Sequence, residues 1–292
     1  MSLHVPENTY TLLDSGDGEK VEQIGPYRVV RPAPTACYPR SVPAFWEQPH
    51  AVYHRSDIGG GEWEFRRPVP EQFDLEMASL KIRVRLTGFG HIGFFPEQQD
   101  NWNLIQSLRT PPGECLQVLN LFAYSGMSTV ACLRKGYAVC HVDSARGMVD
   151  WAGDNVRLNG LADAPVRWMV DDAVKFVKRE VKRSRRYQGF LLDPPAFGRG
   201  LKGEVWKLES GIAELMPLLM ELCENAPAFM IFSCYTHGFG PMNLERILRS
   251  YVTAPGRFFA KELGIREQSG KDYAAGSCAC YLADAVAPDE ER

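Results

Sequence analysis

The chain has 292 residues, of which 45% are apolar and 24% charged, and its formal net charge is -3. This composition is that of a core-forming globular protein and excludes a disordered or fibrous chain, and the length suffices for one large domain or for two. The net charge gives no general attraction to nucleic acid. No window is apolar for long enough to span a bilayer and no secretory leader is recognisable, so we expect a cytoplasmic protein.

The first ninety or so residues are rich in proline, glycine and aromatic side chains. Short alternating or β-branched runs separated by turn residues predict strands joined by turns. These runs span 27–30, 51–53, 62–65 and 80–86. We therefore predict a β-rich amino-terminal domain over residues 1–90, with a possible role in binding substrate.

From residue 91 to residue 292 the pattern alternates between strands and helices, which predicts an α/β fold with a Rossmann-like, doubly wound parallel sheet. The predicted strands span 115–121, 137–142, 166–170, 189–192, 228–233, 258–263 and 278–283. The predicted helices span 127–135, 145–159, 173–184, 207–225 and 242–252.

Eight cysteines are present, and most lie inside apolar strand or helix patterns such as Val130-Ala-Cys132. Buried free thiols in a reducing compartment are therefore expected, rather than disulfides. Cys278 and Cys280 form a close pair, but the partner pair and the histidine spacing of a zinc site are missing. We predict no metal site.

Three apolar strands end in polar or small residues, where open α/β sheets bind their ligands. The first strand ends in a tight turn at Ser125 and Gly126, and the second ends in Asp143, which is suited to hold the two hydroxyls of a ribose. Gly126 is the only glycine in the first turn, whereas a bound pyrophosphate would require more. A cofactor that has a ribose but no phosphates fits this turn better, and S-adenosylmethionine is the common one. The alternatives are that the protein is a nicotinamide-dependent dehydrogenase or a non-catalytic nucleotide-binding module.

These motifs together resemble the class I S-adenosylmethionine-dependent methyltransferases, and more narrowly the branch of the large-subunit ribosomal RNA cytosine-5 and guanine-7 methyltransferases. The resemblance covers about the last two hundred residues and implies a seven-stranded sheet with a final antiparallel pair. The motifs that carry it are Leu119–Gly126, Val142–Ser144, Trp151-Ala, Asn155–Leu161, Asp172 and Leu192–Phe197. The segment Gly93–Trp102 is similar to a further motif of that branch but differs from it at Pro96, Glu97 and Gln99.

The resemblance implies roles for the residues around the cofactor. Asp143 would accept hydrogen bonds from the ribose, and Asp172 would meet the adenine amino group, with Asp171 as its competitor. The residues expected along the methionine and ribose side, or as further contacts, are Gln98, Asn120, Phe122, Tyr124, Ser125, Gly126, Ser144, Ala173 and Asp193. The alternatives are that Asp143 is only a helix cap or turn residue, and that Phe122 and Tyr124 are ordinary packing aromatics.

The segment Leu192-Asp-Pro-Pro-Ala-Phe197 follows a buried strand, and its two prolines stiffen the turn. In amine-directed methyltransferases a similar motif accepts hydrogen bonds from the target amino group, while the aromatic residue stacks on the base. The alternative function is therefore the methylation of an exocyclic amine on nucleic acid or protein, with Asp193 and Phe197 in these roles. Alternatively, the motif is a structural wall of the cofactor pocket.

Cys234 ends the next strand and resembles the nucleophile of the ribosomal cytosine-5 branch. Carbon-5 of a pyrimidine becomes nucleophilic only after a thiolate has attacked carbon-6, which gives a cysteine at this strand end a chemical purpose. Tyr235 stands where the branch often has serine, and the usual amino-terminal RNA-binding module is not recognisable. An inert core thiol is the alternative for Cys234.

The resemblance implies RNA, and ribosomal RNA in particular, as the substrate, and the sequence predicts no oligomeric state. Three regions are candidates to bind it: the basic run 175–186, the glycine-rich loop 197–203, and the amino-terminal aromatics Trp46, Tyr53, Trp63 and Phe65. The basic run is alternatively a solvated helix face with Val174, Val177 and Val181 turned inward, and the aromatics are alternatively the core of a small β unit.

Overall fold

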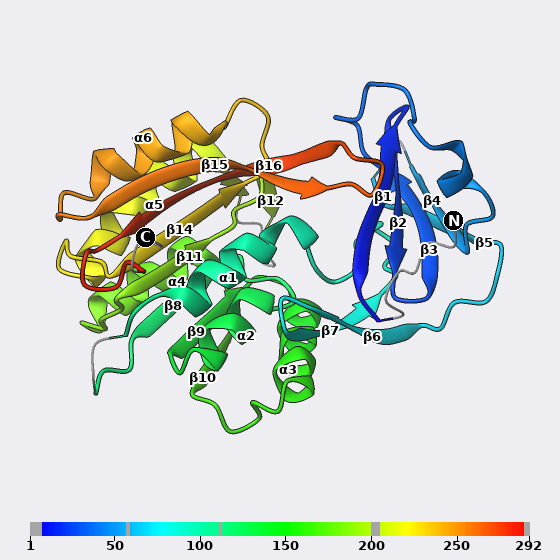
Figure 1. The fold of residues 1–292 in the computed structure, drawn as a ribbon. Coiled ribbons are helices and arrows are strands. Elements are labelled where there is room, and N and C mark those ends of the chain that lie inside the picture. The colour runs from blue at the N-terminus through cyan, green and yellow to red at the C-terminus, as the bar shows by residue number, and fades with distance from the viewer. Residues whose placement is uncertain (1–7, 57–58, 111–112, 200–204, 289–292) are drawn as a thin grey trace. The chain divides into compact units, whose positions relative to one another are not determined.

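A computed structural model describes residues 8–56, 59–110, 113–199 and 205–288 (Figure 1). The chain divides into two compact units. The first unit contains residues 1–99 together with 264–275, and the second contains residues 100–263 together with 276–292. The chain therefore returns to the first unit late in the sequence.

The first unit is built on a five-stranded sheet whose strands follow one another in sequence order, from β1 to β5. All neighbouring pairs are antiparallel except β3 and β4, which are parallel. A small core that includes Val21, Val30 and Phe45 packs against this sheet. The elements are β1 (Tyr10–Gly16), β2 (Glu19–Ile24), β3 (Tyr27–Pro32), β4 (Ala51–Arg55), β5 (Gly61–Phe65), the hairpin β6 (Gln72–Met77) and β7 (Leu80–Arg85), and the short 3-10 helices η1 (Pro43–Trp46) and η2 (Pro96–Gln98).

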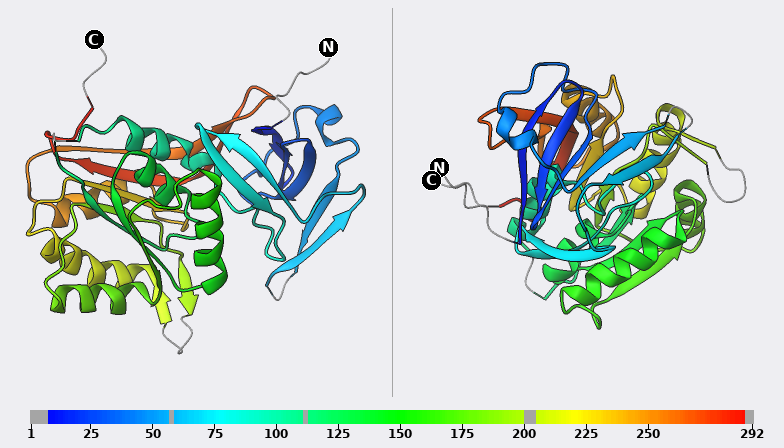
Figure 2. Two further views of the ribbon diagram at one scale, coloured as in Figure 1. Left: turned by 90° about the horizontal axis from the view of Figure 1, so that it is seen from below. Right: turned by 90° about the vertical axis from the view of Figure 1, so that its right-hand side faces the viewer.

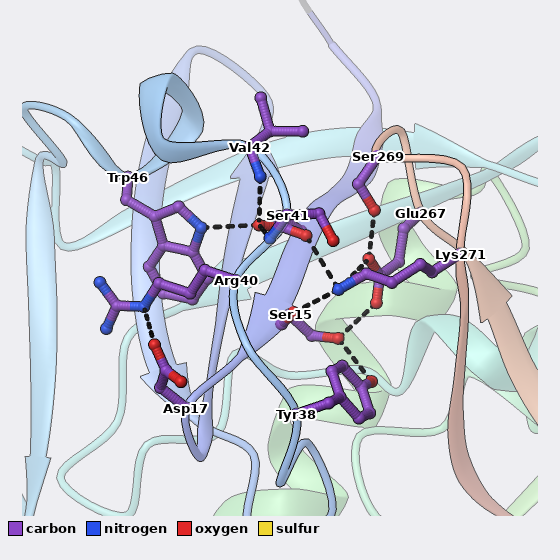
Figure 3. A network of polar contacts seen from close by, with 11 residues as sticks. Ser15, Asp17, Tyr38, Arg40, Ser41, Val42, Trp46, Glu267, Ser269 and Lys271 are labelled. Atoms are coloured by element: carbon purple, nitrogen blue, oxygen red, sulfur yellow. Dashed lines mark hydrogen bonds and ion pairs between the residues drawn. The ribbon is translucent and has the colours of Figure 1, made fainter.

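The tip of a late hairpin, residues 264–275, belongs to the first unit and pairs with β1. The backbone N–H groups of Gln268 and Ser269 donate to the carbonyls of Leu12 and Leu13, each over 2.9 Å. The buried carboxylate of Glu267 accepts hydrogen bonds from the hydroxyls of Ser15 and Ser269 (Figure 3).

Lys271 joins this tip to a second buried carboxylate, that of Asp14. Its ammonium lies 3.3 Å from Asp14 Oδ1 and 3.8 Å from Glu267 Oε2. Figure 3 shows Lys271 beside Glu267. Asp14 Oδ2 also accepts hydrogen bonds from the Trp46 indole over 2.8 Å and from the Ser41 amide over 2.9 Å. The hydrogen bonds and the ammonium hold the pKa of Asp14 below its usual value although burial opposes them.

The second unit contains a seven-stranded sheet in the order β10-β9-β8-β11-β14-β16-β15. The first five strands in this order are parallel, and β16 runs antiparallel to β14. The strands are β8 (Gln117–Leu121), β9 (Ala138–Asp143), β10 (Val166–Val170), β11 (Gly189–Leu192), β14 (Phe229–Cys234), β15 (Arg257–Arg266) and β16 (Asp272–Leu282). This sheet confirms the predicted doubly wound methyltransferase fold with a β-rich amino-terminal part.

Helices cover both faces of this sheet (Figure 2). On one face, alternate strand residues such as Leu121, Leu192 and Phe232 join a large apolar core with side chains of α4, α5 and α6. The other face meets α2, because Asn120 bonds to Thr129 on that helix. The helices are α1 (Gln99–Ser107), α2 (Met127–Arg134), α3 (Arg146–Leu158), α4 (Ala173–Lys182), α5 (Leu208–Leu222) and α6 (Pro241–Tyr251).

All eight cysteines are free, and six of them are buried, which confirms the expectation of reduced, mostly buried thiols. Among the described residues no cluster of histidine, cysteine and carboxylate side chains has the arrangement of a metal site. Within the same residues, no helix combines the length and the apolar character needed to cross a membrane.

Candidate active site

The ends of five parallel strands bring most of the predicted site residues to one edge of the sheet. In the register of the sheet, Asp143 of β9 lies beside Val170 of β10, and Leu121 of β8 lies beside Leu192 of β11. Leu192 in turn lies beside Phe232 of β14. The residues that follow these positions therefore share the carboxyl edge, where open α/β sheets bind ligands. They include Phe122, Asp143, Asp172, Asp193 and Cys234.

The turn after β8 has an unusual backbone that leaves the start of α2 open. Phe122, Tyr124 and Gly126 all have positive φ angles, of 56°, 50° and 81°. A Cβ atom on Gly126 would lie 2.6 Å from the Cβ of Ala152 on α3, so the turn packs too closely for any other residue. Gly126 is the N-cap of α2, and no side chain caps this helix. Its first amide groups and positive dipole end can therefore face a carboxylate.

Asp143 holds this turn while keeping capacity for a ligand. Its Oδ2 accepts a hydrogen bond from the Tyr124 amide over 2.8 Å, and its Oδ1 accepts one from the Ala145 amide over 2.9 Å. Two carboxylate oxygens offer about four acceptor positions, and the amides of Tyr124, Ala145 and Ser144 leave acceptor capacity for a ribose hydroxyl. Burial raises the pKa of Asp143, although these backbone hydrogen bonds oppose the rise. The turn and ribose interpretations of this residue are therefore compatible.

The two aspartates after β10 have different local partners. Asp172 caps α4, because its Oδ1 accepts a hydrogen bond from the Lys175 amide over 2.9 Å. Asp171 forms an ion pair with Arg179 and accepts a hydrogen bond from the Asp172 amide. The charge of Asp171 is thus already compensated, which leaves Asp172 as the better candidate for a contact with adenine.

A buried polar chain supports the turn from beneath, and sequence reasoning identified only its first member. Asn120 donates to Thr129 Oγ1 over 2.9 Å, and Thr129 Oγ1 lies 3.0 Å from His141 Nδ1. Burial lowers the pKa of His141 to about 3, so its ring is neutral at physiological pH. Another buried amide, that of Asn155, donates to the carbonyl of Ser125 over 2.8 Å. The sign of this chain in the sequence is a polar residue inside each of two apolar strands, Asn120 and His141.

Trp206 anchors the segment that follows β11. Its indole donates to the carbonyl of Pro195 over 2.7 Å, and its ring lies 4.7 Å from that of Phe122 between centroids. Trp206 belongs to β13 (Val205–Lys207), which pairs with β12 (Phe197–Arg199). Phe197, at the start of β12, is 52% exposed.

Cys234 is the last residue of β14, and its side chain is 1% exposed. It belongs to the core that packs against α5 and α6, and its Sγ accepts a hydrogen bond from the Thr236 amide over 3.4 Å. Burial raises the pKa of this thiol, and the nearby charge of Asp193 adds to the rise. Cys234 is thus a buried, protonated thiol beside a carboxylate at neutral pH.

The other predicted residues occupy different surroundings. Ser144 is exposed after β9, and Ala173 is buried at the start of α4. Gln98 is buried in the first unit, and its contact with a cofactor stays a prediction. The glycine-rich loop expected to bind RNA falls partly outside the described residues, because these stop at Arg199 and resume at Val205.

Four of the seven basic residues in the run 175–186, which lies on α4 and just after it, pair with neighbouring carboxylates. Within it Lys178 pairs with Glu214, Arg183 with Glu180, and Arg186 with Glu224; Arg179 pairs with Asp171. Val177 is buried, and Val174 and Val181 pack against the core at its edge. These contacts favour the solvated helix face over a track for a phosphate backbone.

The amino-terminal aromatic residues are divided between the core of the first unit and its surface. Tyr53 is buried, and its ring lies 5.2 Å from that of Trp63. Phe65 is 55% exposed and stacks with Trp63 at 6.4 Å between centroids. Trp46 packs at the edge of the small core. Tyr53 therefore belongs to the core of the first unit, whereas the ring of Phe65 is exposed at its surface.

The carboxyl edge fits S-adenosylmethionine. An uncapped helix start suits the methionine carboxylate, a carboxylate at the end of β9 suits a ribose, and a second carboxylate at the end of β10 suits an adenine amino group. The close approach of Gly126 to α3 needs one glycine rather than the three of a dinucleotide site. The single glycine of this turn therefore disfavours NAD as the ligand.

Comparison with known proteins identifies relatives of the chain. A model of the family described as S-adenosylmethionine-dependent methyltransferase matches residues 48–231. The crystal structure of the S-adenosylmethionine-dependent methyltransferase from Agrobacterium tumefaciens has a TM-score of 0.87 and 32% identity, over 94% of this chain and 90% of that one.

Two curated relatives carry ribosomal RNA names. The ribosomal RNA large subunit methyltransferase K/L of Syntrophotalea carbinolica is 30% identical over 49% of this chain and 19% of its own length. The ribosomal RNA large subunit methyltransferase I of Shewanella denitrificans is 27% identical over 63% of this chain and 48% of its own length. The matches thus span at most about half of these curated relatives.

Proposed function

Because the chain belongs to the S-adenosylmethionine-dependent methyltransferase family, we propose that it methylates a base in RNA, with ribosomal RNA as the substrate. The observation that carries this proposal is the placement of Asp193 and Cys234 at adjacent strand ends, on the same edge as the cofactor residues. The names of the curated relatives point to the same substrate class. We also expect a cytoplasmic location, where ribosomal RNA is found.

The family's cofactor supplies a methyl group bonded to a positively charged sulfur. In this chain Asp143 would bind the ribose hydroxyls, the open start of α2 would face the methionine carboxylate, and Asp172 would meet the adenine. The polar chain from Asn120 to His141 fixes the turn between them. The residues after β11 and β14 then face the base to be methylated.

For a cytosine, Cys234 supplies the activation that carbon-5 requires. Its Sγ, after losing its proton, bonds to carbon-6, and the electron pair released onto carbon-5 takes the methyl group. The carbon-5 proton then leaves to a base, for which Asp193 is the neighbouring carboxylate, and the bond from Sγ to carbon-6 breaks. The raised pKa of Cys234 means that this chemistry requires proton removal when the RNA binds.

A second candidate is the methylation of an exocyclic amine, and the burial of Cys234 favours it. Cys234 is almost wholly buried within the core, whereas Phe197 is half exposed. In this reaction Asp193 accepts a hydrogen bond from the amine, Phe197 stacks on the base, and Cys234 has only a structural role. The amine gains the methyl group and loses one proton.

The two chemistries are separated by mass spectrometry of nucleosides from the ribosomal RNA of a deletion strain. The strain should lack one methylated nucleoside, which the complete chain restores and which identifies the atom. Cys234→Ala should fail to restore a 5-methylcytosine but should restore an amine-methylated base, whereas Asp193→Asn should impair either product. Methyl label that enters protein or small molecules but no RNA would refute the proposal.

A further inference from the structure

A polar pocket of about 410 Å³ is lined only by residues of the first unit, none of which is assigned above to the cofactor. It lies between the β2–β3 turn, the segment after η1, and the residues that follow β5. The side chains that matter for its chemistry are Gln23, Arg28, Glu47, Gln48, His50 and Arg67. The pocket is large enough for one nucleotide.

Arg28 contributes a hydrogen-bond donor that the protein leaves unused. Its Nε is buried and has no hydrogen-bond partner among the described residues, while its Nη1 donates to the carbonyl of Glu47 over 3.2 Å. A buried N–H of a charged group without an acceptor costs free energy, which a bound acceptor would recover. The guanidinium is thus held by Glu47, while its buried Nε–H has no acceptor among the described residues.

A second positive charge, that of Arg67, shares the pocket with Arg28. Burial and the repulsion from Arg67 lower the pKa of Arg28, and only the exposed carboxylate of Glu47 opposes them. Arg67 is itself held by a hydrogen bond from its guanidinium to the side-chain oxygen of Gln48. Two like charges held at one pocket favour an anion between them.

His50 adds a third donor. Its Nδ1 accepts a hydrogen bond from the Arg28 amide over 3.0 Å, so in the neutral ring the proton lies on Nε2. Burial and the charges of Arg67 and Arg28 lower the pKa of His50, which keeps the ring neutral at physiological pH. A neutral histidine in the same pocket as two arginines can donate to an anion and can take up a proton once that anion is bound.

We propose that this pocket binds a phosphate group of the RNA substrate, with the guanidinium groups of Arg28 and Arg67 as its principal contacts. Paired guanidinium groups bind phosphate oxygens through charge-assisted hydrogen bonds. The identification of RNA as the source of the phosphate rests on the proposed function, whereas the preference for a phosphate rests on the pocket itself. The pocket thus gives the first unit a part in holding the substrate.

The test measures the binding of a fluorescently labelled single-stranded RNA of about ten nucleotides to the complete chain at several salt concentrations. Arg67→Gln should weaken binding at least about fivefold and reduce the salt dependence by about one phosphate contact. Arg28→Gln should weaken binding further. Arg66→Gln is the matched control, because Arg66 is exposed and paired with Glu64, and it should change the affinity less than about twofold.

Two further measurements make the outcomes distinct. Each variant should bind S-adenosylhomocysteine and unfold thermally like the unaltered chain, which excludes misfolding, and exposed Arg67 is the safer position if Arg28→Gln fails to fold. A phosphorus NMR titration with inorganic phosphate then separates the source of the ligand from the pocket. If the chain binds inorganic phosphate in a manner that requires Arg28 but does not bind RNA, the proposal that RNA supplies the phosphate would be overturned.

Unchanged RNA affinity in both arginine variants, with methyl transfer to RNA intact, would overturn the pocket while the proposed function stands. If the unaltered chain transfers no methyl group to RNA, the proposed function would be overturned instead. Binding of inorganic phosphate would then still report on the pocket alone.

Discussion

The carboxylate of Asp143 accepts backbone hydrogen bonds from Tyr124 and Ala145 and is also the proposed ribose contact. Asp143→Asn keeps one acceptor oxygen for the turn, sets an amide NH2 group against the other backbone N–H, and removes the negative charge. We expect the affinity for S-adenosylhomocysteine to fall by about 1.5–3 kcal/mol, the scale of a lost charge-assisted hydrogen bond. Isothermal titration calorimetry measures this directly. Asp150→Asn, an exposed aspartate on α3, is the control, and an equal loss there would contradict the ribose role.

The same carboxylate gives cofactor binding a dependence on pH. Burial raises the pKa of Asp143 in the free protein, and acceptance of two ribose hydroxyls favours its ionised form. Binding should therefore be complete well above this pKa and weaken as the pH falls through it, at a higher pH than for an exposed aspartate. Calorimetry between about pH 7.5 and pH 4.5 measures the profile. A profile that stays the same in Asp143→Asn would show that another group controls it.

Single residues were predictable where a strand end placed them. Asp143, Asp193 and Cys234 each follow an apolar run, and the register of the sheet brings them to one edge. Thr129 and Arg28 were not predictable, because a helical threonine and a strand arginine acquire their roles only from partners distant in the sequence. The capping role of Asp172 depends on a local amide, and the sequence alone does not separate it from a ligand contact.

At the scale of elements, the turn from β8 into α2 depends on the close approach of Gly126 to α3. Gly126→Ala combines a positive φ of 81° with a Cβ atom 2.6 Å from the Cβ of Ala152. We expect it to lower the free energy of unfolding by about 2–4 kcal/mol, from backbone strain and overpacking together. Urea denaturation measures the change. Gly160→Ala, with a φ of 72° and no atom within 4 Å, should show only the strain, about 1 kcal/mol. Equal effects would disprove the steric argument.

The hairpin of β15 and β16 is tied to β1 through Lys271. Lys271→Met leaves the buried carboxylates of Asp14 and Glu267 without their ammonium, so we expect the first unit to lose about 1–3 kcal/mol of stability. Lys261→Met is the matched control on β15, since Lys261 pairs with Asp100 at the exposed surface. That change should cost less than about 0.5 kcal/mol. Urea unfolding, monitored by hydrogen exchange of the β1 amides, measures the stability of both variants. Equal protection of these amides in the two variants would contradict the role of Lys271.

Elements with a strong period were predicted within a few residues, as for β10 and β11, because alternating or apolar runs define them locally. α1 was not predicted, since the segment before it contains Pro96 and polar residues. β1 and β2 were also missed, because buried Asp14, Ser15 and Glu22 interrupt their apolar pattern. No local sequence pattern predicts that residues near Glu267 pair with β1, since that contact joins segments about 250 residues apart.

At the scale of the whole molecule, the order of the seven strands determines where the cofactor can bind. The five parallel strands end at one edge, and the polar residues of that edge suit a ribose and a methionine better than a pyrophosphate. The alternation of strands and helices predicted this architecture, because a parallel sheet requires a crossover helix after nearly every strand. The substrate lies beyond such reasoning, since unrelated substrates are methylated on the same fold.

The most direct test of this account is a crystal structure of the chain soaked with S-adenosylhomocysteine. We predict density for the nucleoside at the carboxyl edge, with both ribose hydroxyls within hydrogen-bond distance of Asp143 and the amino-acid carboxylate at the start of α2. An empty edge at saturating ligand, or an edge that binds NAD in its place, would contradict the account.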